Sequence, residues 1–121
     1  MTRELYENLC RVFTTDCPPT TMVGVDSDER VFVVAQIYEH YYPQMPKGER
    51  NSGYQYSGVF EMIDEGKYCT LRDVKLFRWK YNAESAFRTM AREQNWRYAD
   101  NPAELKKLLQ SISVDREAAT A

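Results

Sequence analysis

Three long extended segments follow one another in this chain with no helical pattern between them. They span residues 30–42, 54–63 and 67–81, and they are rich in β-branched and aromatic side chains, which pack well on a pleated sheet. Parallel strands need a long crossover, usually a helix, whereas antiparallel strands need only a turn or a loop. The order of the segments therefore predicts an antiparallel sheet. Two shorter segments, 21–25 and 96–98, are candidates for further strands.

Three amphipathic helices are expected beside this sheet, at residues 3–13, 83–95 and 102–112. Each carries apolar residues at helical spacing. The third has the clearest start, because an asparagine cap is followed by Pro102 in the first turn and Glu104 two residues later. The predicted N-caps of the three helices are Thr2, Asn82 and Asn101.

These elements predict an α+β fold of the order α-β-β-β-α-α. It consists of a three- to four-stranded antiparallel sheet with three helices packed on one face. Residues 1–112 are expected to form a single domain, because a chain of 121 residues normally holds one core. Residues 113–121 have no apolar stripe, so we expect a disordered tail there.

Composition and cysteine usage favour a small soluble domain in the cytoplasm. No window approaches 18 consecutive apolar residues, and the N-terminal segment MTRELYENLC is polar, so neither a membrane span nor a secretory signal is expected. Three cysteines without a CxxC spacing do not suggest a disulfide framework.

Few residues suit catalysis, and we expect no catalytic residues, no metal ligands and no cofactor. The chain has one histidine, His40, and it lacks nucleophile-elbow, Walker and dinucleotide-binding motifs. The carboxylates of Asp26 and Asp28 fall in an expected turn, where solvent keeps them ionised. One enzymatic alternative stays open, a Cys–His pair that His40 would form with Cys17 or Cys69.

Tyrosine is in clear excess, with nine in 121 residues. Its ring is amphipathic and is enriched at protein interfaces. More of these rings lie along the extended segments than a small core can hold, so we expect a recognition surface on the sheet face opposite the helices. The loop at 43–53 is long enough to take part. The expected contacts are Tyr38, His40, Tyr42, Lys47, Arg50, Tyr54 and Tyr56.

The first functional hypothesis is therefore a non-catalytic protein-binding module. Such a chain would be a small intracellular inhibitor or adaptor, of the anti-defence or immunity type, whose partner is another protein. Self-association into a homo-oligomer stays open as well.

Charge is unevenly distributed along the chain. Residues 66–97 hold eight Lys or Arg and three Asp or Glu, whereas residues 1–65 hold five and eleven. The two parts can neutralise each other, or the basic part can bind an anionic partner. Interleaved aromatic and basic side chains suit single-stranded nucleic acids, so nucleic-acid binding through strand 67–80 and helix 83–95 is the second hypothesis. Its candidate residues are Lys67, Arg72, Lys75, Arg78, Lys80, Arg88 and Arg92.

Overall fold

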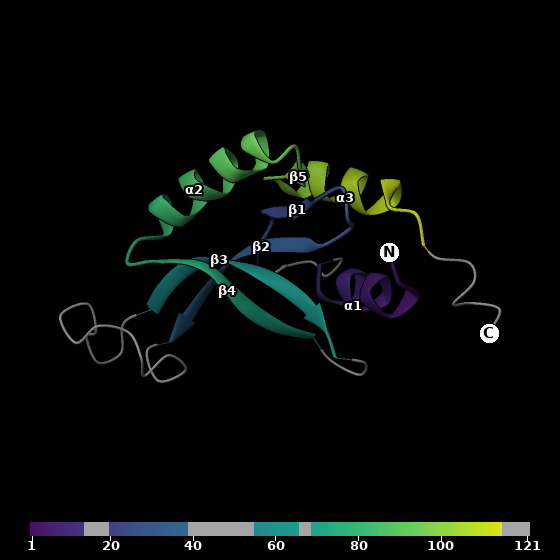
Figure 1. Cartoon of the computed structure of the whole chain (residues 1–121), viewed down its shortest axis with the longest axis horizontal. Coiled ribbons are helices and arrows are strands. Elements are labelled where there is room, and N and C mark those ends of the chain that lie inside the picture. The colour runs from purple at the N-terminus through teal and green to yellow at the C-terminus, as the bar shows by residue number, and fades with distance from the viewer. Residues whose placement is uncertain (14–19, 39–54, 66–68, 115–121) are drawn as a thin grey trace.

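In a computed structural model, the residues that the structure describes form one five-stranded sheet with three helices (Figure 1). The structure describes residues 1–13, 20–38, 55–65 and 69–114, so most of the predicted tail lies outside it. The elements are α1 (Arg3–Phe13), β1 (Val23–Val25), β2 (Val31–Tyr38), β3 (Gln55–Asp64), β4 (Cys69–Phe77), α2 (Lys80–Glu93), β5 (Arg97–Ala99) and α3 (Pro102–Ser111). The strands lie in the order β4-β3-β2-β1-β5, and every neighbouring pair is antiparallel. The predicted α+β class is confirmed, with one strand more than the expected maximum.

Helices cover both faces of the sheet, so the expectation that all three pack on one face is wrong. Val31 and Val33 of β2 join a core cluster with α1 and α3, whereas Phe32 and Val34 join a second cluster with α2. Successive strand residues point to opposite faces, so the two clusters lie on opposite sides of the sheet. Because four consecutive residues of β2 are apolar, neither face can be left to solvent, and each needs a helix over it.

Aromatic rings hold α2 on its face of the sheet. The Trp96 ring stacks on Phe32, with 4.2 Å between the ring centroids and 5° between the planes, and its centroid lies 5.6 Å from that of Phe87 in α2. Both Trp96 and Phe87 also lie against Gly24 of β1, where an added Cβ would be 3.0 Å from Trp96 and 3.2 Å from Phe87. The absence of a side chain at Gly24 therefore lets α2 and the indole approach the sheet closely.

The first and third helices begin where the sequence predicts. The Leu5 N–H donates to the Thr2 hydroxyl oxygen at 3.3 Å, and the Glu104 N–H donates to the Asn101 side-chain oxygen at 2.9 Å. Both predicted caps are thus present. Polar side chains that accept from the first turn of a helix fix its start locally, which is why these boundaries can be found from sequence.

The second helix begins three residues earlier than predicted. Its N-cap is Trp79 rather than Asn82, and no side chain caps it. The Ala83 N–H donates to the Trp79 carbonyl oxygen at 3.3 Å, and Ala83 itself is fully buried. The helical turn that leads to the buried Ala83 therefore begins at Trp79, and residues 78–81 leave the sheet although their sequence still alternates.

A β-bulge in β4 decides which of its side chains lie on the α2 side of the sheet. The register with β3 is regular up to Asp73 and resumes at Lys75, which lies opposite Val59, so Val74 is an extra residue. Val59 belongs to the core cluster under α2, and directly opposed residues share a face of the sheet. The bulge therefore turns Lys75 and Phe77 to the α2 side, whereas strict alternation after Asp73 would place them on the other face.

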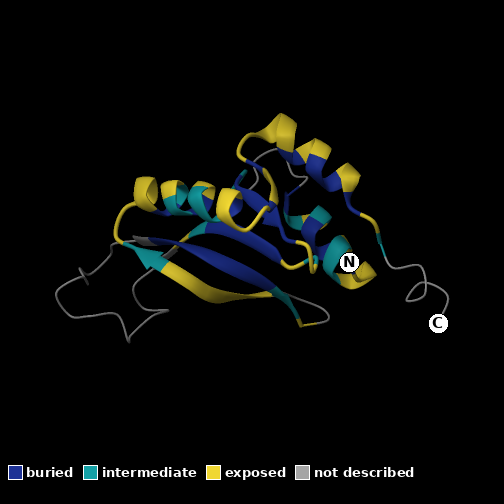
Figure 2. Ribbon diagram, turned by 45° about the horizontal axis from the view of Figure 1, so that its top comes forward, coloured by how far each residue is buried: buried dark blue, intermediate teal, exposed yellow. Residues whose placement is uncertain are grey.

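β4 forms one edge of the sheet and is exposed along most of its length, in contrast to the buried β3 (Figure 2). The side chains of Leu71 and Val74 remain 42% and 41% exposed. A bulge and charged side chains on an edge strand discourage pairing with a strand from another chain. The edge of β4 is thus poorly suited to adding a further strand.

Candidate partner-binding surface

A groove runs between β4 and α2 on the face where the bulge places Lys75 and Phe77. It has a volume of about 450 Å³ and is broadly open to solvent. β4 contributes two residues, and α2 contributes the rest from one side of the helix. The lining residues are Lys75, Phe77, Asn82, Ser85, Ala86, Thr89, Met90 and Glu93.

The groove combines an apolar floor with polar walls. Phe77 and Met90 pack against the core cluster under α2 and remain half-buried. The Lys75 ammonium lies 5.5 Å from the centroid of the Phe77 ring, within the range of a cation–π contact. A cation above an aromatic floor can receive a ligand that carries both an anionic and an apolar group.

The turn from β4 into α2 exposes two aromatic rings that alternate with two cations along the chain. We call residues 78–81 the aromatic–basic turn. Trp79 is 57% exposed and Tyr81 is 75% exposed, and the Arg78 guanidinium lies 5.4 Å from the Trp79 ring centroid. The first turn of α2 contains Lys80 and no acidic residue, although the N-terminal end of a helix favours negative charge. Positive charge therefore concentrates at this turn beside exposed apolar surface.

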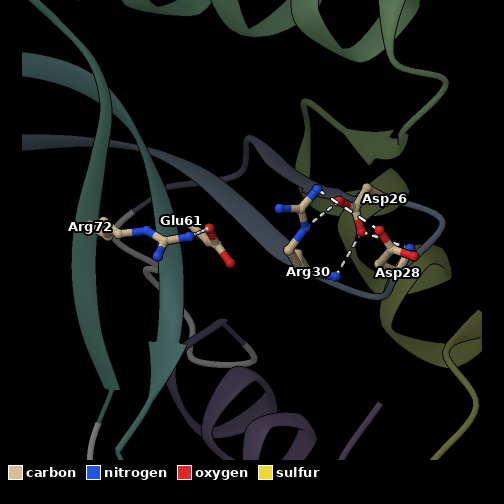
Figure 3. A network of polar contacts seen from close by, with 5 residues as sticks. All are labelled: Asp26, Asp28, Arg30, Glu61 and Arg72. Carbon is tan, nitrogen blue, oxygen red and sulfur yellow. Dashed lines mark hydrogen bonds and ion pairs between the residues drawn. The ribbon is translucent and has the colours of Figure 1, made fainter.

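The predicted nucleic-acid residues divide into two groups. Arg72 pairs with the buried Glu61 across β3 and β4, as Figure 3 shows, and the Arg88 guanidinium nitrogen lies 3.7 Å from the Asp100 carboxylate. Four others form no ion pair within the described part of the chain, and Lys67 lies outside it. These four are Lys75, Arg78, Lys80 and Arg92.

Most of the predicted tyrosine surface lies outside the described residues. This applies to His40, Tyr42, Lys47, Arg50 and Tyr54, and to the side chains of Tyr38 and Tyr56. The backbone register places Tyr38 opposite Gln55 and Tyr56 opposite Ile37. These positions lie at the end of the sheet where Ser57 pairs with Phe77 and β4 turns into α2. The contacts stay a prediction, but the expectation of a sheet face opposite all three helices is wrong, because helices cover both faces.

The acidic turn between β1 and β2 has a structural role. Asp26 is buried, and one of its carboxylate oxygens accepts hydrogen bonds from the N–H groups of Asp28 at 2.9 Å and Arg30 at 2.8 Å (Figure 3). The other oxygen accepts from the Arg30 side chain, and this bond raises the pKa of Arg30. All these contacts lie within the β1–β2 hairpin. The acidic residues of this turn therefore stabilise the hairpin itself, and no ligand is needed to account for them.

The sequence leaves one enzymatic alternative open, a Cys–His pair that includes His40. Cys10 lies half-buried in α1, where its hydrogen bond with Tyr6 raises the pKa of the tyrosine. His40, Cys17 and the side chain of Cys69 lie outside the described residues, so the Cys–His alternative stays a hypothesis. Within the described ranges, no group of His, Cys, Asp and Glu side chains could hold a metal ion.

Sequence reasoning found the basic residues but did not find the groove. Lys75 and Phe77 were expected in one long strand, and the bulge that turns them toward α2 contains no turn residue that would indicate it.

None of the helices in the described part is long and apolar enough to cross a membrane. No family model, curated protein or solved structure matches the chain.

Proposed function

We propose that this protein is a non-catalytic protein-binding module, a small inhibitor or adaptor, that binds an acidic partner through the aromatic–basic turn and the adjoining groove. The observation that carries the proposal is the exposure of Trp79 and Tyr81 between cations that have no carboxylate partner within the described residues. Tryptophan, tyrosine and arginine are the residue types that dominate binding energy at protein interfaces.

Leaving these two rings in water forgoes the free energy that their burial would supply. Burying an aromatic side chain removes 150–250 Å² of surface and stabilises an interface by roughly 25 cal/mol per Å² of apolar area. Neither ring of the turn contributes to the two core clusters. Folding gains little from Trp79 and Tyr81, so a partner that covers both rings would gain the free energy of burying them.

A nucleic-acid partner is the second candidate, favoured by the alternation of Arg78, Trp79, Lys80 and Tyr81. Single strands bind by base stacking on aromatic rings with cations along the backbone. Internal pairing of Arg72 and Arg88 leaves fewer free cations than the sequence offers. The protein is also acidic overall, with a net charge of −2, so the observations favour a protein partner.

The test is capture of partners from a nuclease-treated lysate of cells that produce the protein. Wild-type protein is compared with the double variant Trp79→Ala/Tyr81→Ala. A further double variant, Lys106→Ala/Lys107→Ala, removes two charges from the exposed side of α3 and serves as the control. Captured proteins are identified by mass spectrometry, purified, and titrated against each variant by calorimetry.

We expect one protein to bind wild type and the α3 control equally and to lose at least tenfold in affinity for the aromatic variant. Both aromatic positions are exposed, so the variant should retain the thermal midpoint of wild type within a few degrees. If the captured protein binds the aromatic variant as tightly as wild type, the proposal is contradicted. Retention of nucleic acid in samples without nuclease, lost with the aromatic variant, supports the second candidate instead.

A further inference from the structure

We infer that the groove between β4 and α2 binds an acidic peptide segment of the partner in an extended conformation. This inference rests on the proposed protein-binding function and assigns a specific occupant to the groove. Three features carry it: the length of the groove, the free polar groups along its helical wall, and the distribution of charge.

The length of the groove matches a short extended peptide. Asn82, Ser85, Thr89 and Glu93 follow one another along one side of α2 at spacings of three, four and four residues. A helix rises about 1.5 Å per residue, so these 11 steps span roughly 16 Å. An extended chain rises about 3.3 Å per residue, so the same length holds about five residues of a peptide.

The helical wall offers hydrogen-bonding groups that the fold does not use. Serine and threonine inside helices often donate to the carbonyl four residues earlier. The hydroxyls of Ser85 and Thr89 and the amide of Asn82 form no such bond, and they have no other hydrogen-bond partner among the described residues. A peptide backbone carries one donor and one acceptor per residue, so it can use all three groups.

Charge fixes the chemistry of the peptide. Lys75 lies in the opposite wall and has no carboxylate partner within the described ranges. Arg78 and Lys80 add positive charge at the end where α2 begins, and Glu93 is the single acid at the end where α2 stops. An acidic side chain is therefore expected beside Lys75, with an apolar side chain over Phe77 and a donor near Glu93.

The same features disfavour other occupants. A nucleic-acid strand carries a phosphate on every nucleotide, so over about 16 Å it would bring negative charge close to the Glu93 carboxylate. Sites for small molecules typically bury 70–90% or more of the ligand, whereas this groove is broadly open to solvent. A peptide that is anchored elsewhere on the surface needs no such enclosure.

The experiment uses an array of seven-residue peptides that carry one or two Asp or Glu residues at one end, Leu, Val or Phe in the middle, and Ser or Asn at the other end. Matched sets carry Asn or Gln, or Lys, in place of the acids. The strongest binder is labelled with fluorescein and titrated by anisotropy against wild type and two groove variants. Lys75→Glu reverses the charge, and Ser85→Trp fills the groove from an exposed position. Lys106→Glu on α3 makes the same charge change away from the groove.

We expect wild type to select acidic peptides, and both groove variants to bind the labelled peptide at least tenfold more weakly. Lys106→Glu should stay within twofold, and thermal midpoints of all variants should show that they fold. Equal binding of acidic and neutral sets, unchanged affinity in both groove variants, or displacement of the peptide by a seven-nucleotide oligothymidylate would each overturn the inference.

Failure of this inference is distinguishable from failure of the proposed function. A purified partner that loses affinity for Trp79→Ala/Tyr81→Ala but binds both groove variants like wild type would show a protein-binding module that does not use the groove. A partner indifferent to all these variants would contradict the proposed function as well.

Discussion

Replacing Gly24 by alanine tests how α2 is held against the sheet. The new methyl carbon would lie 3.0 Å from a Trp96 ring carbon and 3.2 Å from one of Phe87, whereas carbon atoms pack best at about 3.5–4.0 Å. The two rings cannot shift easily away from the new methyl group, because Trp96 is stacked on Phe32 and Phe87 is fully buried. Overpacking of this kind costs about 1–3 kcal/mol.

The lower backbone entropy of alanine in the unfolded chain opposes this cost and reduces the net loss of stability. Alanine loses less backbone entropy on folding than glycine, which favours the variant by about 0.4–1 kcal/mol. We therefore expect Gly24→Ala to lower the free energy of unfolding by about 1–2 kcal/mol and the thermal midpoint by about 5–10 °C. Urea denaturation followed by far-UV circular dichroism measures the first quantity, and a thermal scan measures the second.

A double variant shows whether the ring contact is the cause. Phe87→Leu removes part of the ring beside Gly24, so its combination with Gly24→Ala should lose less stability than the sum of the two single changes. A neutral or stabilising Gly24→Ala, or strict additivity in the double variant, would refute this account of how the aromatic rings hold α2 on the sheet.

Three further changes test other parts of the fold by thermal and urea denaturation. Gly58→Ala places a methyl carbon 2.8 Å from the backbone carbonyl oxygen of Lys75, which cannot move without disturbing β4. We therefore expect the free energy of unfolding to fall by about 2 kcal/mol or more. A fall of less than about 0.5 kcal/mol would contradict the register of β3 and β4. Arg72→Ala leaves the Glu61 carboxylate buried without its partner and should lower the free energy of unfolding by about 1–3 kcal/mol. Adding Glu61→Leu should restore part of this stability, and the absence of any recovery would exclude the ion pair as the cause. Asn101→Ala removes the cap of α3 and should cost about 1 kcal/mol, whereas Asn101→Asp should cost little.

Local signals made the class of fold predictable. The caps at Thr2 and Asn101 act within one helical turn, and both helices begin where these residues indicate. The extended segments are likewise recognisable from their β-branched and aromatic content. The placement of the helices was wrong because it depends on the sheet as a whole. Residues 31–34 are apolar on both faces, and this pattern calls for a cover on each side.

Nonlocal packing decided the parts of the site that the sequence did not predict. Residues 78–81 alternate as a strand would, yet they leave the sheet and lead into the first turn of α2, where Ala83 is buried. The extra residue Val74 reverses the faces of Lys75 and Phe77, and only pairing with β3 shows that it is extra. A groove that exists because of one inserted residue cannot be found by counting along one strand.

The charge asymmetry of the chain is resolved by this geometry. Internal neutralisation accounts for Arg72 and Arg88, whose partners Glu61 and Asp100 come from other elements. It does not account for the cations of the groove and the aromatic–basic turn, which gather at one end of an otherwise acidic molecule. Such a pole would attract the acidic partner that we propose over about one Debye length, roughly 8–10 Å at physiological salt. Added salt should therefore slow association more than it speeds dissociation, because the exposed rings supply the short-range contact that salt does not screen.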